Sequence, residues 1–341
     1  MTSRLWLVGA LLVAIVAATS AGAVRIPPGT IVSLVLARAG LMHGPHQGSS
    51  TDDTILFDVR LPRVVMAALV GAALSTVGVL FQALLRNPLA DPYAIGTSGG
   101  AALGAALGMT VAARVGNDII GAAPLLAFVG AIGTTLLVYS LARVGGRTPI
   151  TTLLLAGVIV SVTCGYAMSL LLLLSDRYGG DTRLVYVWLL GGVTVVRWTH
   201  VAALGVLVCV GCAIAWGWAR RLNTLSLGED AAASVGLDVE RLKTAVILVG
   251  SLLTAAAVSA AGLVGFVGLV VPHVARLVAG PNHTRLIPSA VLGGATFLVL
   301  ADLLARTAAP PTEIPLGIVT AFAGGPLFLF LLRRSRHAYR T

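Results

Sequence analysis

The sequence predicts an all-α, polytopic membrane protein with about ten transmembrane helices. Hydrophobic residues make up 57% of the 341 residues, and only 11% are charged. A soluble domain of this length needs far more charge to cover its surface. The apolar residues also gather in runs of about 20, the length that crosses a bilayer as a helix. We therefore expect one transmembrane domain over residues 1–341.

The first apolar segment is Leu5–Ala23. Arg4 before it and small residues at its end imitate a secretory signal, but the many spans that follow favour an uncleaved helix. Residues 25–59 are more polar and predict an external loop with a short amphipathic helix around Ile31 to Ala37. The later candidate spans are Val64–Leu85, Ile95–Ala112, Ala122–Ala142, Thr151–Leu174, Val201–Trp218, Ala245–Ala261, Val264–Val278, Leu286–Leu304 and Ile314–Leu332.

Two apolar segments are shorter than a full span. Leu184–Val196 is broken by Gly191 and Gly192, which predicts a partly inserted or external helix. The span from Val264 carries Pro272, which predicts a broken or kinked helix.

The arginines indicate how the chain lies in the membrane. An even number of spans places both termini on one side. Of the 23 Lys and Arg residues, 14 then fall on the side of the termini and 9 on the other. Because cytosolic loops carry the excess of positive charge, we expect both termini in the cytosol. The net charge of +10 therefore reflects orientation in the membrane and does not indicate nucleic-acid binding.

A polar segment from Leu222 to Lys243 interrupts the apolar pattern, and the same rule places it in the cytosol. Glu229 and Asp230 suit the positive N-terminus of a short helix that Gly236 would stop. Asp238 can cap a second short helix. The segment is either an ordinary interhelical loop or a compact knob of two short helices at the membrane surface.

No cysteine or histidine pattern indicates a redox or metal site. The three cysteines are an odd number within apolar segments, and Cys209-x-x-Cys212 lacks the βαβ context of a redox motif. His43 and His46 have a metal-binding spacing, but without further ligands a solvated loop is favoured.

Small and turn-forming residues predict local structure around the third span. The turn from Arg86 to Pro92 contains Asn87 and Asp91, whose side chains can satisfy backbone groups there. Glycines every four residues would line one helix face and let another backbone approach closely. These glycines are Gly96, Gly100, Gly104 and Gly108.

The sequence carries no constellation of an enzyme or an ion-coupled carrier. No charged residue stands in mid-span, and Asp302 and Arg306 near a helix end indicate an i, i+4 ion pair. A proton-coupled secondary transporter or an intramembrane enzyme would need buried titratable or paired catalytic groups. Lys243 is the only lysine, so the chain has no phosphate-binding loop and should not hydrolyse ATP alone. If transport is active, its energy comes from another subunit.

The order of motifs from Arg60 onward resembles the FecCD family of ABC-importer permeases. The matching motifs are Arg60-Leu61-Pro62-Arg63, Gly71-Ala72-Ala73-Leu74, Gln82-Ala83-Leu84, Asn87-Pro88-Leu89-Ala90-Asp91-Pro92, Gly96 to Gly100, Leu153-Leu154-Leu155-Ala156-Gly157, Gly265-Phe266-Val267-Gly268-Leu269-Val270-Val271-Pro272-His273, Ala301-Asp302 and Glu313-Ile314-Pro315-Leu316-Gly317.

The resemblance implies a type II ABC-importer permease in the bacterial cytoplasmic membrane. Such a subunit has ten helices and pairs with a second copy around a central pathway. Two cytosolic ATPase subunits would carry ATP and Mg²⁺, so this chain would bind no cofactor itself, and a substrate-binding protein would dock outside. The family imports iron–siderophores, haem and cobalamin. An iron chelate is the expected substrate, and cobalamin is the alternative.

The resemblance also assigns roles to individual residues. Residues 222–243 would hold the helices that contact the ATPases, with coupling residues Leu227, Gly228, Glu229, Asp230, Ala231, Ser234, Gly236 and Leu237. The inner gate would be Ile150, Thr151 and Thr152, where Ile150 replaces one of the small hydroxyl residues of the cobalamin permease. Arg60, Arg63 and Arg306 would dock the binding protein.

Overall fold

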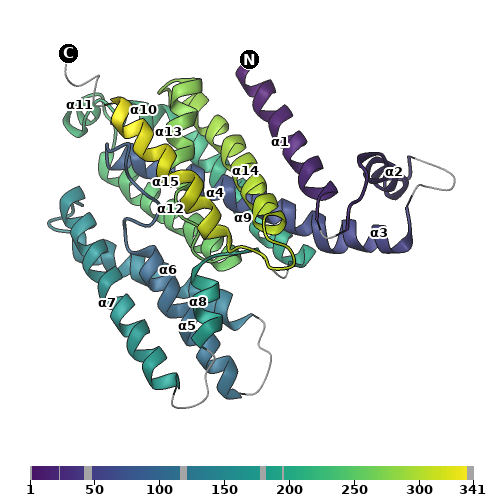
Figure 1. Ribbon diagram of the computed structural model, residues 1–341. Coiled ribbons are helices and arrows are strands. Elements are labelled where there is room, and N and C mark those ends of the chain that lie inside the picture. Colours follow the sequence, from purple (N-terminus) through teal and green to yellow (C-terminus); the bar gives the residue numbers. More distant parts are fainter. Residues whose placement is uncertain are drawn as a thin grey trace.

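The computed structural model describes residues 2–22, 24–41, 48–115, 121–176, 182–193 and 196–335, and these residues form helices joined by turns (Figure 1). The helices are α1 (Thr2–Ser20), α2 (Pro28–Arg38), α3 (Ser50–Thr54), the π-helical turn η1 (Ile55–Arg60), α4 (Leu61–Leu84), α5 (Thr97–Val115), α6 (Ala122–Ala142), α7 (Ile150–Asp176), α8 (Thr182–Leu189), α9 (Trp198–Gly217), α10 (Ala219–Leu225), α11 (Glu229–Ser234), α12 (Val239–Ala261), α13 (Val267–Ala279), α14 (His283–Thr307) and α15 (Leu316–Ser335).

Each expected span coincides with a helix, which confirms the prediction of an all-helical, polytopic membrane protein. Within the described ranges, six helical segments are long and apolar enough to cross a membrane: Ser50–Leu84, α6, α7, α9, α12 and α14. Shorter apolar helical stretches lie within α1 (Leu5–Ser20), α5 (Thr97–Ala113) and α15 (Leu316–Phe330), and α13 is itself one of them. The short helices α2 and α8 lie where an amphipathic piece and a partly inserted helix were predicted.

The structure corrects three details. The second helix of the polar segment is not a separate short helix, because the chain continues without a break from Val239 to Ala261 as α12. Of the predicted break or kink at Pro272, the break does not occur, since α13 continues through this residue. Residues 50–60 are helical and lead directly into α4, because Ser49 and Asp52 form a capping box that starts α3. The prediction of a loop over residues 50–59 is therefore wrong.

Helix α4 occupies the centre of the bundle. In the segment Ser50–Leu84, which contains α4, 83% of the most hydrophobic 18-residue stretch is buried within the chain. A Cβ atom at Gly71 would lie 2.1 Å from the carbonyl oxygen of Gly294 on α14. A Cβ atom at Gly78 would lie 1.9 Å from the carbonyl oxygen of Gly268 on α13. The backbones of these helices are therefore in direct contact, as small residues permit in membranes.

A second close pair is α5 and α6. Cβ atoms at Gly100, Gly104 and Gly108 would lie 2.3, 2.0 and 2.7 Å from backbone carbonyl oxygens of α6. The predicted glycine face thus lies against α6. Gly96 differs from the other three, because it precedes the helix and has a φ of +91°.

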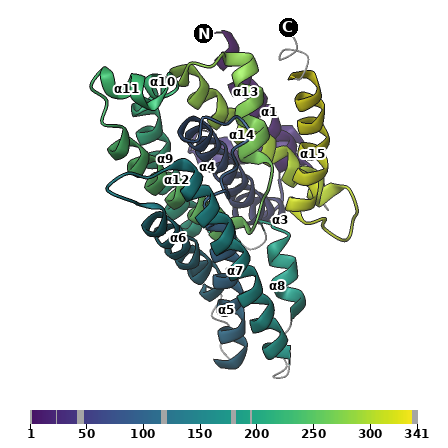
Figure 2. The same cartoon turned by 90° about the vertical axis from the view of Figure 1, so that its left-hand side faces the viewer.

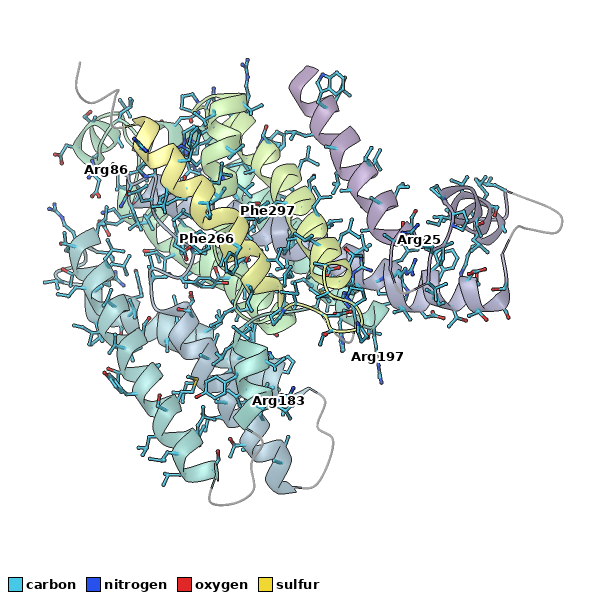
Figure 3. The ribbon with its side chains drawn as sticks, in the orientation of Figure 1. Arg25, Arg86, Arg183, Arg197, Phe266 and Phe297 are labelled. Atoms are coloured by element: carbon cyan, nitrogen blue, oxygen red, sulfur yellow. The ribbon has the colours of Figure 1, made fainter. Side chains whose placement is uncertain are left out.

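The two ends of the bundle differ in the helix termini and in the arginines that lie there. The start of α1 and the end of α15 lie at the end that carries α10 and α11 (Figures 1 and 2). Arg86 lies at this end, whereas Arg183 and Arg197 lie toward the opposite one (Figure 3). These arginines are grouped as the charge pattern predicts.

We predict that Gly78→Ala destabilises the fold, because the added methyl group meets the backbone of α13. The expected loss in the free energy of unfolding is about 1–3 kcal/mol, typical of overpacking. The measurement is thermal unfolding of the purified chain in detergent. Gly133→Ala on α6 is the matched control, since nothing lies within 4 Å of a Cβ atom there. Equal stability of the two variants would contradict the prediction.

Candidate functional site

The polar segment forms a compact knob, a name we use for residues 222–243. Helix α11 begins after Gly228, whose φ is +116°. It ends in two hydrogen bonds, from Gly236 N–H to the carbonyl of Ala233 and from Leu237 N–H to the carbonyl of Ala232. This helix ending needs a left-handed residue, and Gly236 supplies it with a φ of +85°. The predicted stop at Gly236 is therefore confirmed.

The knob presents apolar and acidic side chains to its surroundings. Leu227 is 75% exposed and Val235 is 71% exposed. Of the predicted coupling residues, Leu227, Asp230, Ala231, Ser234 and Gly236 are exposed, and Gly228, Glu229 and Leu237 are half-buried. Asp238 caps α12, as predicted, by accepting a hydrogen bond from the Arg241 N–H.

A buried ion cluster holds the knob against the rest of the chain. The ammonium group of Lys243 lies 2.6 Å from a carboxylate oxygen of Glu229 and 3.0 Å from one of Glu240. The Lys243 side chain is only 4% exposed. Lys243 also donates to the Thr148 carbonyl at 3.5 Å, and Glu240 accepts from the Thr148 N–H at 3.0 Å. The sequence predicts none of these contacts, because those with Thr148 join residues 92 and 95 positions apart.

Thr148 connects this cluster to the predicted gate. Val144 and Arg147 exchange two backbone hydrogen bonds around Gly145 and Gly146, so the preceding residues form a tight turn. Pro149 accepts the first hydrogen bond of α7, which begins at Ile150. The gate residues Ile150, Thr151 and Thr152 thus form the first turn of α7, and the knob contacts the chain two residues before them.

Two further contacts anchor the knob and its neighbours. The Asn223 amide on α10 donates to Asn282, and its oxygen accepts from the His283 N–H at the start of α14. Asn282 caps α14, and the Asn–His–Thr sequence could have indicated that cap. The pairing with Asn223 joins distant residues and could not be predicted.

The turn after α4 has the predicted local bonds. The Asn87 side chain accepts from Leu89 N–H, and the Asp91 side chain accepts from Tyr93 N–H. Burial raises the pKa of the Asp91 carboxyl, and burial also raises the pKa of the Tyr93 hydroxyl. The Tyr93 hydroxyl binds both the N–H and the carbonyl of Val264, so this turn is fixed to the segment before α13.

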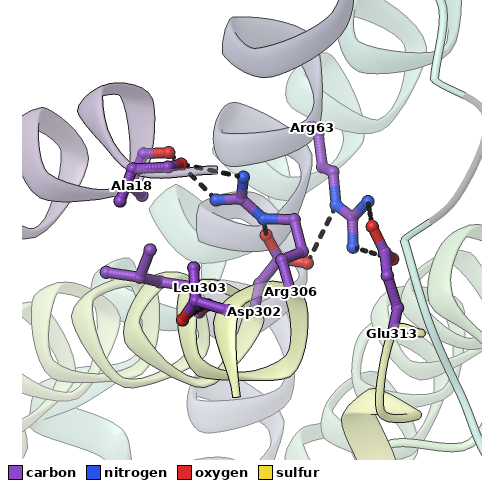
Figure 4. Close-up of polar contacts among 8 residues, drawn as sticks. Ala18, Arg63, Asp302, Leu303, Arg306 and Glu313 are labelled. Carbon is purple, nitrogen blue, oxygen red and sulfur yellow. Dashed lines mark hydrogen bonds and ion pairs between the residues drawn. The ribbon is translucent and has the colours of Figure 1, made fainter. Parts of the chain in front are cut away.

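The three predicted docking arginines converge at the opposite end of the bundle. Asp302 is 1% exposed. Its two carboxylate oxygens lie 3.0 Å from Nε of Arg63 and 2.9 Å from Nε of Arg306 (Figure 4). Arg63 also forms two hydrogen bonds with Glu313, at 3.0 and 2.8 Å. The predicted pair of Asp302 and Arg306 is confirmed, and it belongs to a larger cluster.

Arg60 and Arg306 also bind the end of α1. Arg306 donates to the Ala18 carbonyl at 2.9 Å, and Arg60 donates to the carbonyls of Thr19 and Val24. Carbonyls at a helix C-terminus lack partners within the helix and attract cations. Arg60 is 6% exposed, so these contacts give it a structural role and leave little of it for a partner protein.

A cavity of about 370 Å³ opens beside this cluster. Its lining combines charged residues from α4, α14 and the segment before α15 with residues from the end of α8. The lining residues include Arg63, Asp302, Glu313, Trp188, Gly191 and Leu316. Backbone hydrogen bonds from Leu316 and Gly317 to Gly191 and Leu190 fix α8 to the start of α15.

Comparison with known proteins identifies the family. The model of the FecCD transport family matches residues 10–334. The chain belongs to the FecCD transport family. The cobalamin import system permease protein BtuC of Halobacterium salinarum is 45% identical over 283 residues, which cover 83% of this chain and 74% of the relative. The hemin transport system permease protein HmuU of Yersinia pestis is 38% identical over 299 residues, which cover 84% and 86%.

The FecCD assignment agrees with a solved structure. An inward-facing ABC transporter, provisionally assigned to the metal-chelate type, superimposes with a TM-score of 0.81 at 30% identity. The match covers 98% of this chain and 99% of the other. The chain is therefore an ABC-importer permease with the type II fold, and its family is not catalytic. His43 and His46 lie outside the described residues.

We predict that Asp302→Asn destabilises this FecCD permease, because it leaves Arg63 and Arg306 buried without their shared carboxylate. Removing one partner of a buried ion pair typically costs about 3–5 kcal/mol. Thermal unfolding in detergent measures the effect. Asp53→Asn is the control, because Asp53 pairs with Arg38 in an exposed ion pair whose loss costs about 1 kcal/mol or less. Comparable losses in the two variants would refute the structural role.

Proposed function

We propose that this chain forms one half of the translocation pathway of an ABC importer in the bacterial cytoplasmic membrane. A second copy completes the pathway, because one chain carries one set of the motifs and a symmetric pathway needs two. Both termini and the knob face the cytosol. Two ATPase subunits bind there with ATP and Mg²⁺, and a substrate-binding protein docks on the other side. Native mass spectrometry of the complex in detergent tests the homodimer.

The exposed surface of the knob is the observation that carries the coupling role. Leu227 and Val235 are both exposed on a segment whose acidic residues must lie in water. Apolar side chains rimmed by charges are typical of a protein contact surface. The chain lacks a phosphate-binding loop, so energy has to enter through such a contact.

We propose an iron chelate as the substrate and keep cobalamin as the second candidate. Curated relatives carry names for both classes: siderophore, iron(III) citrate and hemin permeases on one side and cobalamin permeases on the other. Ile150 replaces one of the small hydroxyl residues that the resemblance implies for the gate of the cobalamin permease, so the gate differs from that permease at this position. The 45% identity to a cobalamin permease favours the second candidate.

Transport by the reconstituted complex tests this proposal. We expect proteoliposomes with both partner proteins to accumulate a ferric siderophore or hemin when ATP is supplied. The isolated chain should hydrolyse no ATP. Cyanocobalamin is the competing probe, and its uptake in place of the iron compounds would establish the second candidate. Uptake driven by an ion gradient without ATPase subunits would overturn the function itself.

We retain Arg60, Arg63 and Arg306 as proposed docking residues, with a condition set by their contacts. Charge reversal at Arg60 or Arg306 would disturb the end of α1 as well as any partner. Arg63 is the most accessible of the three, with 13% of its side chain exposed beside the half-exposed Glu313. Arg63→Gln should slow association with the binding protein at low salt, and an unchanged rate would remove it from the site.

We predict that Gly236→Val uncouples ATP hydrolysis from transport. A β-branched residue resists the left-handed conformation at this position, which costs about 1–2 kcal/mol for an L-residue and distorts the end of α11. The measurement is substrate transported per ATP hydrolysed. Gly236→Asn is the matched control, because asparagine tolerates the left-handed region. Normal transport by an assembled Gly236→Val complex would show that the knob does not couple.

A further inference from the structure

The ion cluster around Lys243 lies between the knob and the predicted gate residues 150–152, the two sites that transport has to connect. Its members come from three separate parts of the chain: Glu229 from α11, Glu240 and Lys243 from the first turns of α12, and Thr148 from the segment between α6 and α7. Each carboxylate has one contact at 3.0 Å or less to Lys243. The chain holds no other lysine.

The backbone of Thr148 is held at both of its polar groups. Its N–H donates to Glu240 at 3.0 Å, and its carbonyl accepts from Lys243. The residue is 2% exposed, so water does not compete for these bonds. The Lys243 side chain is 4% exposed, whereas the two carboxylates that bind it are 31% exposed.

The segment around Thr148 has little freedom to absorb a displacement. On one side it follows the tight turn of Val144 to Arg147, and on the other Pro149 leads directly into α7. Proline fixes the backbone φ angle at that junction. A shift of Thr148 is therefore passed to the first turn of α7, which carries Ile150, Thr151 and Thr152.

We propose that Lys243 is a positioning residue that transmits movement of the knob to the gate. It binds α11 to α12 through Glu229, so the two helices move as one body. Together with Glu240, Lys243 also holds the backbone of Thr148. A movement of α11 and α12 therefore displaces the start of α7. This inference rests on the proposed coupling role of the knob and the gate role of residues 150–152, and it names the contact between them.

A neighbouring bond offers a matched comparison. The Tyr139 hydroxyl on α6 lies 2.9 Å from the Thr244 hydroxyl on α12. This bond also fixes the first turns of α12, but it does not involve Thr148 or α11. Tyr139→Phe removes it with almost no change in shape, so it controls for general loosening of α12.

The experiment measures access to the gate in the assembled complex with its ATPase subunits. The native Cys164, Cys209 and Cys212 are replaced by alanine, and Thr151→Cys introduces one thiol at an exposed position. The rate of its modification by N-ethylmaleimide is compared without nucleotide and with ATP plus orthovanadate. In otherwise unchanged protein, we expect the two rates to differ.

Loss of the cluster should remove this difference. In Lys243→Met, the ratio of the two modification rates should become one. In Lys243→Arg, the rates should still differ, because a cation remains at this position. Glu229→Gln should give the same loss while the pair of Lys243 and Glu240 stays intact, so it serves where Lys243→Met fails to assemble. Tyr139→Phe should keep the original ratio.

Three results would overturn the proposal in distinguishable ways. A ratio that is unchanged in both Lys243→Met and Glu229→Gln removes the cluster from the link and leaves the coupling role standing. The same loss in Tyr139→Phe shows general loosening of α12 and no specific role for Lys243. Equal rates already in the unmutated complex show that Thr151 is not at a nucleotide-dependent gate, and the gate assignment fails with the inference.

Discussion

Direct contact between helix backbones is the constraint on which the rest of the bundle depends. In lipid no hydrophobic driving force brings helices together, so packing of small residues has to do so. Gly71 and Gly78 place α4 against α14 and α13, and Gly268 and Gly294 complete these contacts from the other side. Once α4 is enclosed in this way, both the knob and the Asp302 cluster are fixed at the ends of helices that contact it.

The buried charges follow from the same shortage of water. Burial of Asp302 is tolerated because the guanidinium groups of Arg63 and Arg306 share its carboxylate. Arg306 also binds a backbone carbonyl at the end of α1, and Arg63 also binds Glu313. Burial of the Lys243 ammonium group is tolerated because two half-exposed carboxylates and a backbone carbonyl surround it. Each cluster joins elements that are far apart in sequence, so the cost of burying charge also fixes how those elements meet.

The structural features that could be predicted from the sequence are those that depend on residues close together in the chain. Spans, the cap at Asp238, the stop at Gly236 and the turn bonds of Asn87 and Asp91 all arise within a few positions. The helix from Ser50 could also have been read from the capping box of Ser49 and Asp52. The contacts of Thr148 with Glu240 and of Arg63 with Glu313 could not, because they span 92 and 250 residues and leave no local pattern. The burial of Arg60 was missed for the same reason.

The two charge clusters also differ in what they can do. Around Asp302, arginines hold a carboxylate that is 1% exposed and also bind the end of α1, which suits a fixed support, although Arg63 also reaches the exposed Glu313. Around Lys243, the carboxylates are 31% exposed and one of them belongs to α11, a six-residue helix that stands at the surface. A short exposed helix has little packing of its own to resist displacement. Among the residues that the structure describes, the pair of Glu229 with Lys243 is the salt bridge between α11 and α12, so a displacement of α11 acts directly on that pair.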